Sequence, residues 1–150
     1  MKRIGYFFIF FFVGFLVALS IFLASNNSDE MTEVCVEGNC FSVELAQTNA
    51  EKSRGLMFRE SLGRNEGMLF VYDSDGEYGF WMKNTLIFLD IIWIDSEMEV
   101  VHIEHNARPC REEKCESLKP GKNARFVLEI NGGLAEELGI GLGDKVGFDL

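Results

Sequence analysis

Proline and histidine are scarce in this sequence, with two residues of each among 150, and several common catalytic signatures are missing. There is no G-x-S-x-G, no phosphate-binding P-loop and no G-x-G-x-x-G fingerprint, and no serine or cysteine has an evident histidine partner. The two histidines, His102 and His105, are three residues apart, which on a strand places them on opposite faces. The sequence therefore gives little support for a nucleophilic enzyme, a nucleotide-binding enzyme or a histidine metal centre.

Positive charge is also in short supply. The chain has 14 Lys+Arg against 24 Asp+Glu, a formal net charge of −10. Without residues 1–25, which contain two cations and no acidic residue, 12 Lys+Arg face 24 Asp+Glu and the net charge is −12. Nucleic-acid binding depends on cations that neutralise phosphates, and anionic membranes attract basic segments. We therefore expect no nucleic-acid partner and attribute the acidity to solubility.

One long hydrophobic run is present at residues 4–24, where 21 uncharged residues stand together. As a helix rising about 1.5 Å per residue, this run spans roughly 30 Å, the thickness of the hydrocarbon core of a bilayer. Lys2 and Arg3 precede it, and Asp29 and Glu30 follow it. The positive-inside rule then predicts a single-pass membrane protein with a cytoplasmic N-terminus and an extracytoplasmic remainder.

Three regions follow from this membrane segment. Residues 1–25 would form a cytoplasmic tip and a transmembrane helix that acts as a signal anchor, and residues 26–33 a polar linker. Residues 34–150 would form one extracytoplasmic β-rich domain, a length that suits a single core. A cleaved signal peptide is the alternative, because small residues such as Ala24 and Ser25 end the apolar run. In that case the domain would be secreted.

The four cysteines form two C-x4-C pairs, Cys35 with Cys40 and Cys110 with Cys115. Disulfides persist outside the cytoplasm, so we predict two local disulfides, the first across a four-residue hairpin loop at 36–39. A zinc site with four thiolates has compatible spacing and stays open as an alternative, as do free thiols. No C-x-x-C is present, which argues against a redox-active pair.

Hydrophobic alternation in the exported region predicts mainly strands. The expected strands are 34–36, 41–46, 67–72, 78–82, 88–94, 98–105, 124–130 and 145–150, with a turn at 73–76. Short helices are expected at 49–55, where Thr48 and Glu51 have capping-box spacing, and at 133–138, which Gly139 could end. The pattern favours a single compact antiparallel sandwich or barrel-like domain.

The longest irregular stretch, 106–122, contains both prolines and the second cysteine pair. A long ordered loop closed by a disulfide often frames a site. A surface flap without a function is the equally simple interpretation.

Several motifs in the exported region occur in a familiar order. They are G-L-M-F-R at 55–59, G-M-L-F at 67–70, F-W-M-K-N-T at 80–85, L-D-I at 89–91, and V-L-E-I at 127–130 followed by G-I-G-L-G-D-K-V at 139–146. In order and spacing they resemble the family called domain of unknown function 192, over about residues 41–150. The resemblance implies a compact β-sandwich or barrel-like fold with one or two short helices, and no established activity. Phe88 departs from the family pattern, which usually has proline before Leu-Asp.

The strongest candidate site is a cluster of polar and aromatic residues. Its members are Arg54, Arg59, Trp81, Lys83, Asn84, Thr85 and Asp90. On a strand, Trp81, Lys83 and Thr85 would share one face, where an indole can cover a small ligand and polar groups can orient it. The arginines could hold a carboxylate or a phosphate. The structural alternative is that Asp90 and an arginine form a buried ion pair.

Three other groups are weaker candidates. The methionines Met57, Met68 and Met82 could offer thioethers to Cu(I), but without M-x-M or M-x-x-M spacing they more simply fill the core. His102 and Glu104 could form an acid–base pair, or lie at a strand edge without a role. Glu129 could be catalytic, although a carboxylate that bonds backbone amides at the next helix start is the simpler interpretation. No metal and no other cofactor is predicted.

Three functions are compatible with these features. The favoured one is a membrane-anchored extracytoplasmic module of the cell envelope that binds a small polar ligand or a segment of an envelope protein. The second is an envelope hydrolase that uses Asp90 or Glu129 with an arginine. The third is a purely structural partner of another membrane protein. Whether the chain is an enzyme at all stays open, because no catalytic motif is present.

Overall fold

The computed structural model describes residues 31–150. The predicted anchor at 4–24 lies outside these residues, as does most of the predicted linker at 26–33. Within 31–150, no helix is long and apolar enough to cross a membrane. The first strand begins at Met31, so the last three residues of the predicted linker belong to the folded domain.

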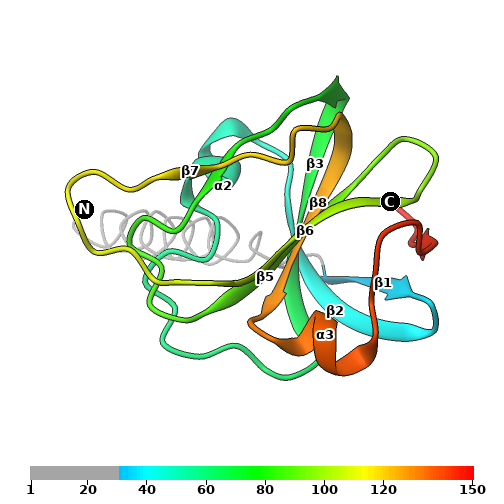
Figure 1. Cartoon of the computed structure of the whole chain (residues 1–150), viewed down its shortest axis with the longest axis horizontal. Coiled ribbons are helices and arrows are strands. Elements are labelled where there is room, and N and C mark those ends of the chain that lie inside the picture. The colour runs from blue at the N-terminus through cyan, green and yellow to red at the C-terminus, as the bar shows by residue number, and fades with distance from the viewer. Residues whose placement is uncertain (1–30) are drawn as a thin grey trace, which may run out of the picture.

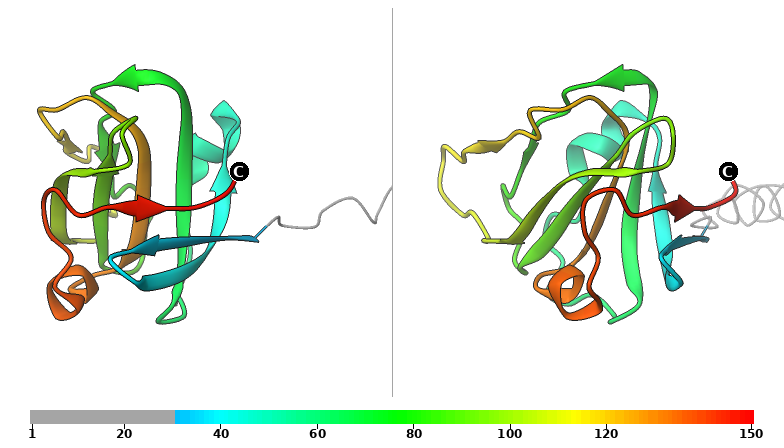
Figure 2. Two further views of the ribbon diagram at one scale, coloured as in Figure 1. Left: turned by 90° about the vertical axis from the view of Figure 1, so that its right-hand side faces the viewer. Right: turned by 45° about the vertical axis from the view of Figure 1, so that its right-hand side comes forward.

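Most of the domain is one curled sheet of seven strands, which bends into a half-barrel (Figures 1 and 2). Along the chain these strands are β1 (Met31–Val36), β2 (Asn39–Ala46), β3 (Glu66–Gly76), β5 (Leu89–Ile94), β6 (Val100–Ala107), β8 (Ala124–Asn131) and β9 (Val146–Gly147). Their order in space is β6-β5-β8-β3-β2-β1-β9. The prediction of a mainly β domain is confirmed.

Three smaller pieces complete the domain. A two-stranded ribbon pairs β4 (Phe80–Trp81) with β7 (Ser117–Leu118). Helices α2 (Asn49–Arg54) and α3 (Leu134–Leu138) lie near opposite ends of the sheet (Figures 1 and 2). The long 106–122 stretch, which includes β7, extends to the left in Figure 1 and returns to the sheet at β8.

The predicted antiparallel arrangement is wrong at one pair of strands. β2 and β3 run parallel, in register from Ser42 opposite Glu66 to Ala46 opposite Phe70, whereas the other neighbours in the sheet are antiparallel. Parallel neighbours need a long crossover, and residues 47–65 provide it. Side-chain alternation predicts which face of a strand is buried but not the direction in which the strand runs. The crossover is what brings α2 onto one face of the sheet.

The first hairpin is tighter than predicted. Val36 pairs with Asn39 and Cys35 with Cys40, so the turn is only Glu37 and Gly38 rather than four residues. Both turn residues have positive φ, 46° and 84°, as a two-residue type I′ hairpin requires. The register still places the two cysteines directly opposite each other.

Three strands differ in length from their predictions. The residues expected to form a turn at 73–76 continue β3 as far as Gly76, after an irregularity beyond Val71. The strand expected at 78–82 is reduced to the two residues of β4, because it pairs only with the equally short β7. The strand expected at 145–150 is reduced to β9, which contacts β1 at two positions. In each case the partner strand, rather than local composition, decides the length.

Both helices begin and end where the local signals predict. In α2 the Thr48 hydroxyl accepts from the Glu51 backbone N–H, and the Glu51 carboxylate accepts from the Thr48 N–H, which is a complete capping box. α3 ends at Gly139, whose φ of 73° suits a glycine in the left-handed region.

The sheet separates two hydrophobic cores, which we name for the helices beside them. The α3-side core contains Val34, Phe41, Leu69, Ile92, Ile94, Leu128, Ile130, Leu134 and Ala135, among others. The α2-side core contains Leu56, Met68, Phe70, Phe80, Met82, Leu89, Ile91, Trp93 and Val127, among others. Every residue of β5 is buried, since alternate side chains enter the two cores, which confirms the prediction of a doubly covered central strand.

Candidate functional site

Glu129 is a buried carboxyl group in the middle of β8. It is 4 % exposed and lies on the same side of the strand as Val127, toward the α2-side core. Its Oε2 atom has no hydrogen-bond partner among the described residues. Burial raises the pKa of Glu129 to about 8, so the group is mostly protonated at pH 7. The expectation that Glu129 bonds the amides of the following helix is wrong.

Asp90 performs the role that was expected of Glu129. This fully buried side chain accepts backbone N–H bonds from Asn106 and Gly133 at its Oδ1 (2.7 and 2.9 Å) and from Ala135 at its Oδ2 (2.7 Å). It therefore holds the start of α3 against β5. No arginine among the described residues pairs with Asp90, so the predicted ion pair is wrong.

A partly open cleft, with an enclosed space of about 20 Å³, lies where α2, β3, β4 and β8 meet, and Glu129 is one of its lining residues. The lining residues are Lys52, Ser53, Arg54, Gly55, Leu56, Met57, Phe70, Phe80, Trp81, Lys83, Thr85 and Glu129. The lining thus combines a buried carboxyl group that has an unpartnered oxygen with apolar side chains and three cations.

Four of the seven predicted site residues line this cleft, namely Arg54, Trp81, Lys83 and Thr85. The other three do not. Arg59 forms an ion pair with Glu44, and Asp90 faces the opposite core. Asn84 lies behind the cleft wall, where its N–H and C=O bond to other loops.

The predicted alternation along 80–85 fails at its end. Phe80 and Met82 are buried and Trp81 is 47 % exposed, as expected for a strand. Asn84 has a φ of 56°, outside the strand region, and Thr85, which also lines the cleft, is buried, whereas Trp81 is half exposed and Lys83 partly exposed.

The 106–122 stretch supports the outer wall of the cleft. Trp81 pairs with Ser117 in the β4–β7 ribbon. On both sides of Lys83 the backbone is tied to Cys110, whose N–H donates to the Met82 carbonyl (3.1 Å) and whose carbonyl accepts from the Asn84 N–H (2.9 Å). The stretch is therefore more than a surface flap, since it holds Trp81 and Lys83 in place.

Lys83 and Trp81 contact each other at the rim. The Lys83 Nζ atom lies 5.6 Å from the centre of the Trp81 ring, within reach of a cation–π interaction.

On the α2 side, the Lys52 Nζ atom lies 4.5 Å from the centre of the Tyr72 ring. Burial, with smaller effects of Tyr78 and Glu129, raises the pKa of Tyr72 to about 12.

Gly55 brings backbone close to the buried carboxyl group. It ends α2 with a φ of 47°, a conformation that side chains disfavour. A Cβ at this position would lie 3.3 Å from Cζ of Phe70 and 3.9 Å from Oε2 of Glu129. A side chain at Gly55 would therefore intrude on the cleft.

Sequence reasoning missed Lys52 and gave Glu129 the wrong role. An acidic residue inside the apolar run at 126–130 was the available signal, because a carboxyl group in a buried strand requires a partner or a function. No local signal marks Lys52, which reaches the cleft only because the β2–β3 crossover places α2 there.

The other weak candidates occupy ordinary structural positions. Met68 and Met82 are buried in the α2-side core, as the core-filling interpretation predicted. Met57 lines the cleft, and its Sδ atom lies 4.0 Å from the Asn84 amide nitrogen. His102 packs against Trp93, with ring centres 5.2 Å apart, and lies outside the cleft.

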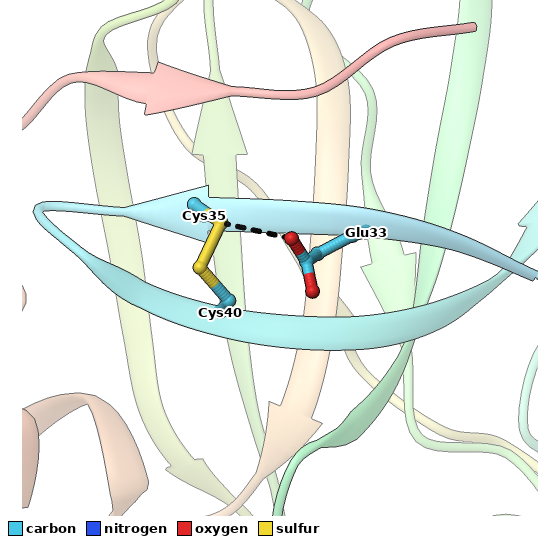
Figure 3. Close-up of side chains that lie close together, drawn as sticks. All are labelled: Glu33, Cys35 and Cys40. Atoms are coloured by element: carbon cyan, nitrogen blue, oxygen red, sulfur yellow. Dashed lines mark hydrogen bonds between the residues drawn. A yellow bond between two sulfur atoms is a disulfide. The ribbon is translucent and has the colours of Figure 1, made fainter.

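The cysteines form the two local disulfides, Cys35–Cys40 and Cys110–Cys115. The first closes the β1–β2 hairpin and the second lies in the 106–122 stretch, at opposite sides of Figure 1. A shared four-thiolate site is therefore not formed. Glu33 Oε1 lies 3.8 Å from the Cys35 sulfur (Figure 3), which is a van der Waals contact, because a disulfide sulfur has no proton to donate.

Comparison with known proteins gives a consistent result. The profile of the DUF192 family, described as "Uncharacterized ACR", matches residues 32–148. A UPF0127 protein from Thermococcus gammatolerans is 32 % identical over 110 residues, which is 72 % of this chain and 67 % of the relative.

Two crystal structures are similar to this fold. A protein of unknown function from Novosphingobium aromaticivorans is 42 % identical, with a TM-score of 0.75 over 82 % of this chain and 89 % of the other. A protein from Sinorhizobium meliloti, described as a candidate transcription regulator, is 29 % identical, with a TM-score of 0.74 over 83 % of this chain and 98 % of the other.

Proposed function

The chain belongs to the DUF192 family, as the order of its motifs predicted, and from that premise we propose that it is a small-ligand binding module of the cell envelope. The family has no characterised activity, so the proposal depends on the cleft. The observation that carries it is the Glu129 carboxyl group, whose Oε2 atom is buried and unpartnered on a residue that lines the cleft. An unsatisfied buried polar group costs about 1–3 kcal/mol, and a bound ligand would offset that cost.

The remaining walls are suited to holding a small molecule. Phe70 and Phe80 provide apolar surface, Trp81 provides a rigid aromatic lid at the rim, and Lys83 provides charge. Ligand sites typically combine a mainly apolar lining with a few convergent polar groups. The enclosed part of the cleft, about 20 Å³, has room for little more than one water molecule, so a ligand would lie mainly across the open side of the cleft.

We place this module outside the cytoplasm, tethered by residues 4–24, with a cleaved and secreted form as the alternative. The order of charges around that segment supports the orientation. Two disulfides in a domain of this size suit an oxidising compartment. We do not extend the description of the Sinorhizobium meliloti protein to this chain, because its acidic excess opposes binding to phosphate backbones.

A hydrolase is the second candidate, and one observation favours it. A carboxyl group with a raised pKa can act as a general acid near neutral pH. However, no second acidic residue from positions 31–150 lines the cleft, and Asp90 is engaged by the backbone at the start of α3. Two-carboxylate hydrolysis of the glycosidase type is therefore disfavoured.

The experiment is a thermal-shift screen of polar metabolites against the exported domain. At least one compound class should raise the melting temperature of the wild type. Trp81→Ala and Lys83→Ala should remain folded and lose that shift. Matched controls are Phe88→Ala, an equally exposed aromatic outside the cleft, and Lys145→Ala, an exposed lysine elsewhere. The proposal fails if no compound shifts the wild type, or if the shift survives both cleft substitutions.

A further inference from the structure

We infer that the cleft recognises the carboxylate of a small, partly apolar molecule, with the unpartnered Glu129 carboxyl as hydrogen-bond partner and Lys83 and Arg54 as cationic partners. This inference rests on the proposed binding function and specifies the chemistry of its ligand.

The first support is the distribution of charge. Of the 24 acidic residues, Asp29 and Glu30 lie outside the described part of the chain, and of the other 22 only Glu129 lines the cleft. Three of the 12 cations at positions 31–150 line the same cleft, namely Lys52, Arg54 and Lys83. A strongly acidic domain thus has one small cationic concavity, and low-dielectric walls strengthen its attraction for an anion.

The second support is that these cations are not neutralised by the protein. Within residues 31–150, the ion pairs involve Arg59, Arg64, Arg125 and Lys145, and none involves a cation of the cleft. Lys52 and Lys83 instead approach aromatic rings. Their charges therefore stay available to an incoming oxyanion.

The third support is the buried carboxyl group itself. A neutral carboxyl has one O–H donor, and a carboxylate ligand has only acceptors, so the two are complementary. Burial raises the pKa of Glu129 to about 8, which keeps that proton in place at neutral pH. A cationic ligand would meet three cations and no ionised carboxylate in the cleft, so it is excluded on electrostatic grounds.

The walls decide between an organic acid and a free inorganic anion. Five of the twelve lining residues are large and apolar, namely Leu56, Met57, Phe70, Phe80 and Trp81. A strongly hydrated phosphate would gain little from such a surface, whereas a carboxylate on an apolar body would bury that body there. The predicted ligand class is therefore a small organic carboxylate.

The test uses benzoate, its neutral analogue benzamide, and inorganic phosphate as probes, measured by calorimetry on the exported domain at pH 6 and pH 9. Benzoate should bind more tightly than either other probe. Its Kd should rise about tenfold between pH 6 and pH 9, because only the protonated fraction of Glu129 is competent. Lys83→Ala should weaken benzoate binding and leave benzamide unchanged, whereas Lys145→Ala should alter neither.

Glu129→Gln is the decisive variant, since its amide keeps a donor that does not titrate. It should bind benzoate at both pH values with the same Kd. If it does not fold, the pH dependence of the wild type and the Lys83→Ala contrast still decide the question.

The results separate this inference from the proposed function. Equal binding of benzamide and benzoate, tighter binding of phosphate, or a benzoate Kd that does not change with pH would overturn the inference. If no probe binds but neutral metabolites give a shift that depends on Trp81, only the inference is wrong. If neither the probes nor the metabolite screen gives binding, both are wrong.

Discussion

Two buried carboxyl groups on adjacent strands have opposite roles because they face opposite sides of the sheet. Asp90 pairs across the strands with Ile130, and Glu129 pairs with Ile91. The two-residue period of a strand sends Asp90 toward the three backbone N–H groups around the start of α3, and Glu129 toward the cleft. The first carboxylate is therefore structural, and the second is available to a ligand.

Replacement of Glu129 by glutamine should change how stability depends on pH. The pKa of Glu129 is about 8 in the folded domain against 4.5 for an ordinary glutamate, so the unfolded state releases its proton first as pH rises. The stability that the neutral side chain provides is complete below pH 4.5 and is lost by pH 8, at a limiting slope of about 1.4 kcal/mol per pH unit. Glu129→Gln lacks this slope.

Urea unfolding at several pH values between 4.5 and 9 measures the effect. The free energy of unfolding of the wild type should fall relative to that of Glu129→Gln up to about pH 8, and the difference should then be constant. Glu136→Gln, on the exposed side of α3, is the control and should show no such trend. A difference that is independent of pH would contradict a buried neutral carboxyl group.

At the scale of elements, the cleft is made where short pieces of structure meet. α2 contributes Lys52 and Arg54, the β4–β7 ribbon contributes Trp81, and the backbone around Lys83 is tied to Cys110. The capping box and the local disulfide were both readable from the sequence. The place where they meet was not readable, because it depends on the parallel β2–β3 crossover and on the pairing of β4 with β7, from which 35 residues separate it in the chain.

The two disulfides should contribute similar stability but have different local effects. Each closes a loop of the same sequence separation, 5, so Cys→Ser replacement of either pair should cost roughly 2 kcal/mol in the chain-entropy account. Only the double replacement of Cys110 and Cys115 by serine should loosen the backbone at residues 82–84. Met82 and Asn84 form backbone hydrogen bonds with Cys110, and Lys83 lies between them.

Hydrogen exchange of the Asn84 amide distinguishes the two variants. Exchange should be about tenfold faster, or more, in the variant that lacks Cys110–Cys115. The variant that lacks Cys35–Cys40 serves as the matched control and should exchange like the wild type at this amide. Equal protection of Asn84 in both variants would show that the second disulfide does not support the cleft.

At the scale of the whole molecule, the half-barrel presents its cleft on one side and buries a second core on the other. The α3-side core includes both residues of the β1–β2 hairpin that flank Cys35, namely Val34 and Val36. The α2-side core forms the floor of the cleft through Phe70 and Phe80. One sheet thus provides both a buried core and the surface on which the cleft lies.

The proposed tether predicts where the full chain resides in the cell. The full-length protein should stay with membranes after an alkaline carbonate wash, and external protease should digest the acidic domain. A variant without residues 4–24 should be absent from the membrane fraction. If an intact mass measurement shows that the mature protein begins near Ser25, the cleaved form is favoured. If external protease leaves the domain intact, the predicted orientation is wrong.

The sequence by itself determined the family, the predominance of strands, both helix caps and the local pairing of cysteines. Each of these depends on residues close together in the chain, where alternation, capping and loop closure act directly. It also placed Arg54, Trp81, Lys83 and Thr85 in one candidate site. The four side chains do line one cleft, because three of them lie between positions 81 and 85 and α2 packs beside that segment.

Only the tertiary structure decided the direction of β3, the exclusion of Arg59 and Asp90 from the cleft, and the isolation of the Glu129 carboxyl group. The physical reason is that each of these depends on residues that are distant in the sequence and meet on a neighbouring strand or on one face of the sheet. Residues adjacent in the sequence carry no signal of that meeting. A carboxylate is structural where three amide N–H groups converge on it, as on Asp90, and is available for function where none does, as on Glu129.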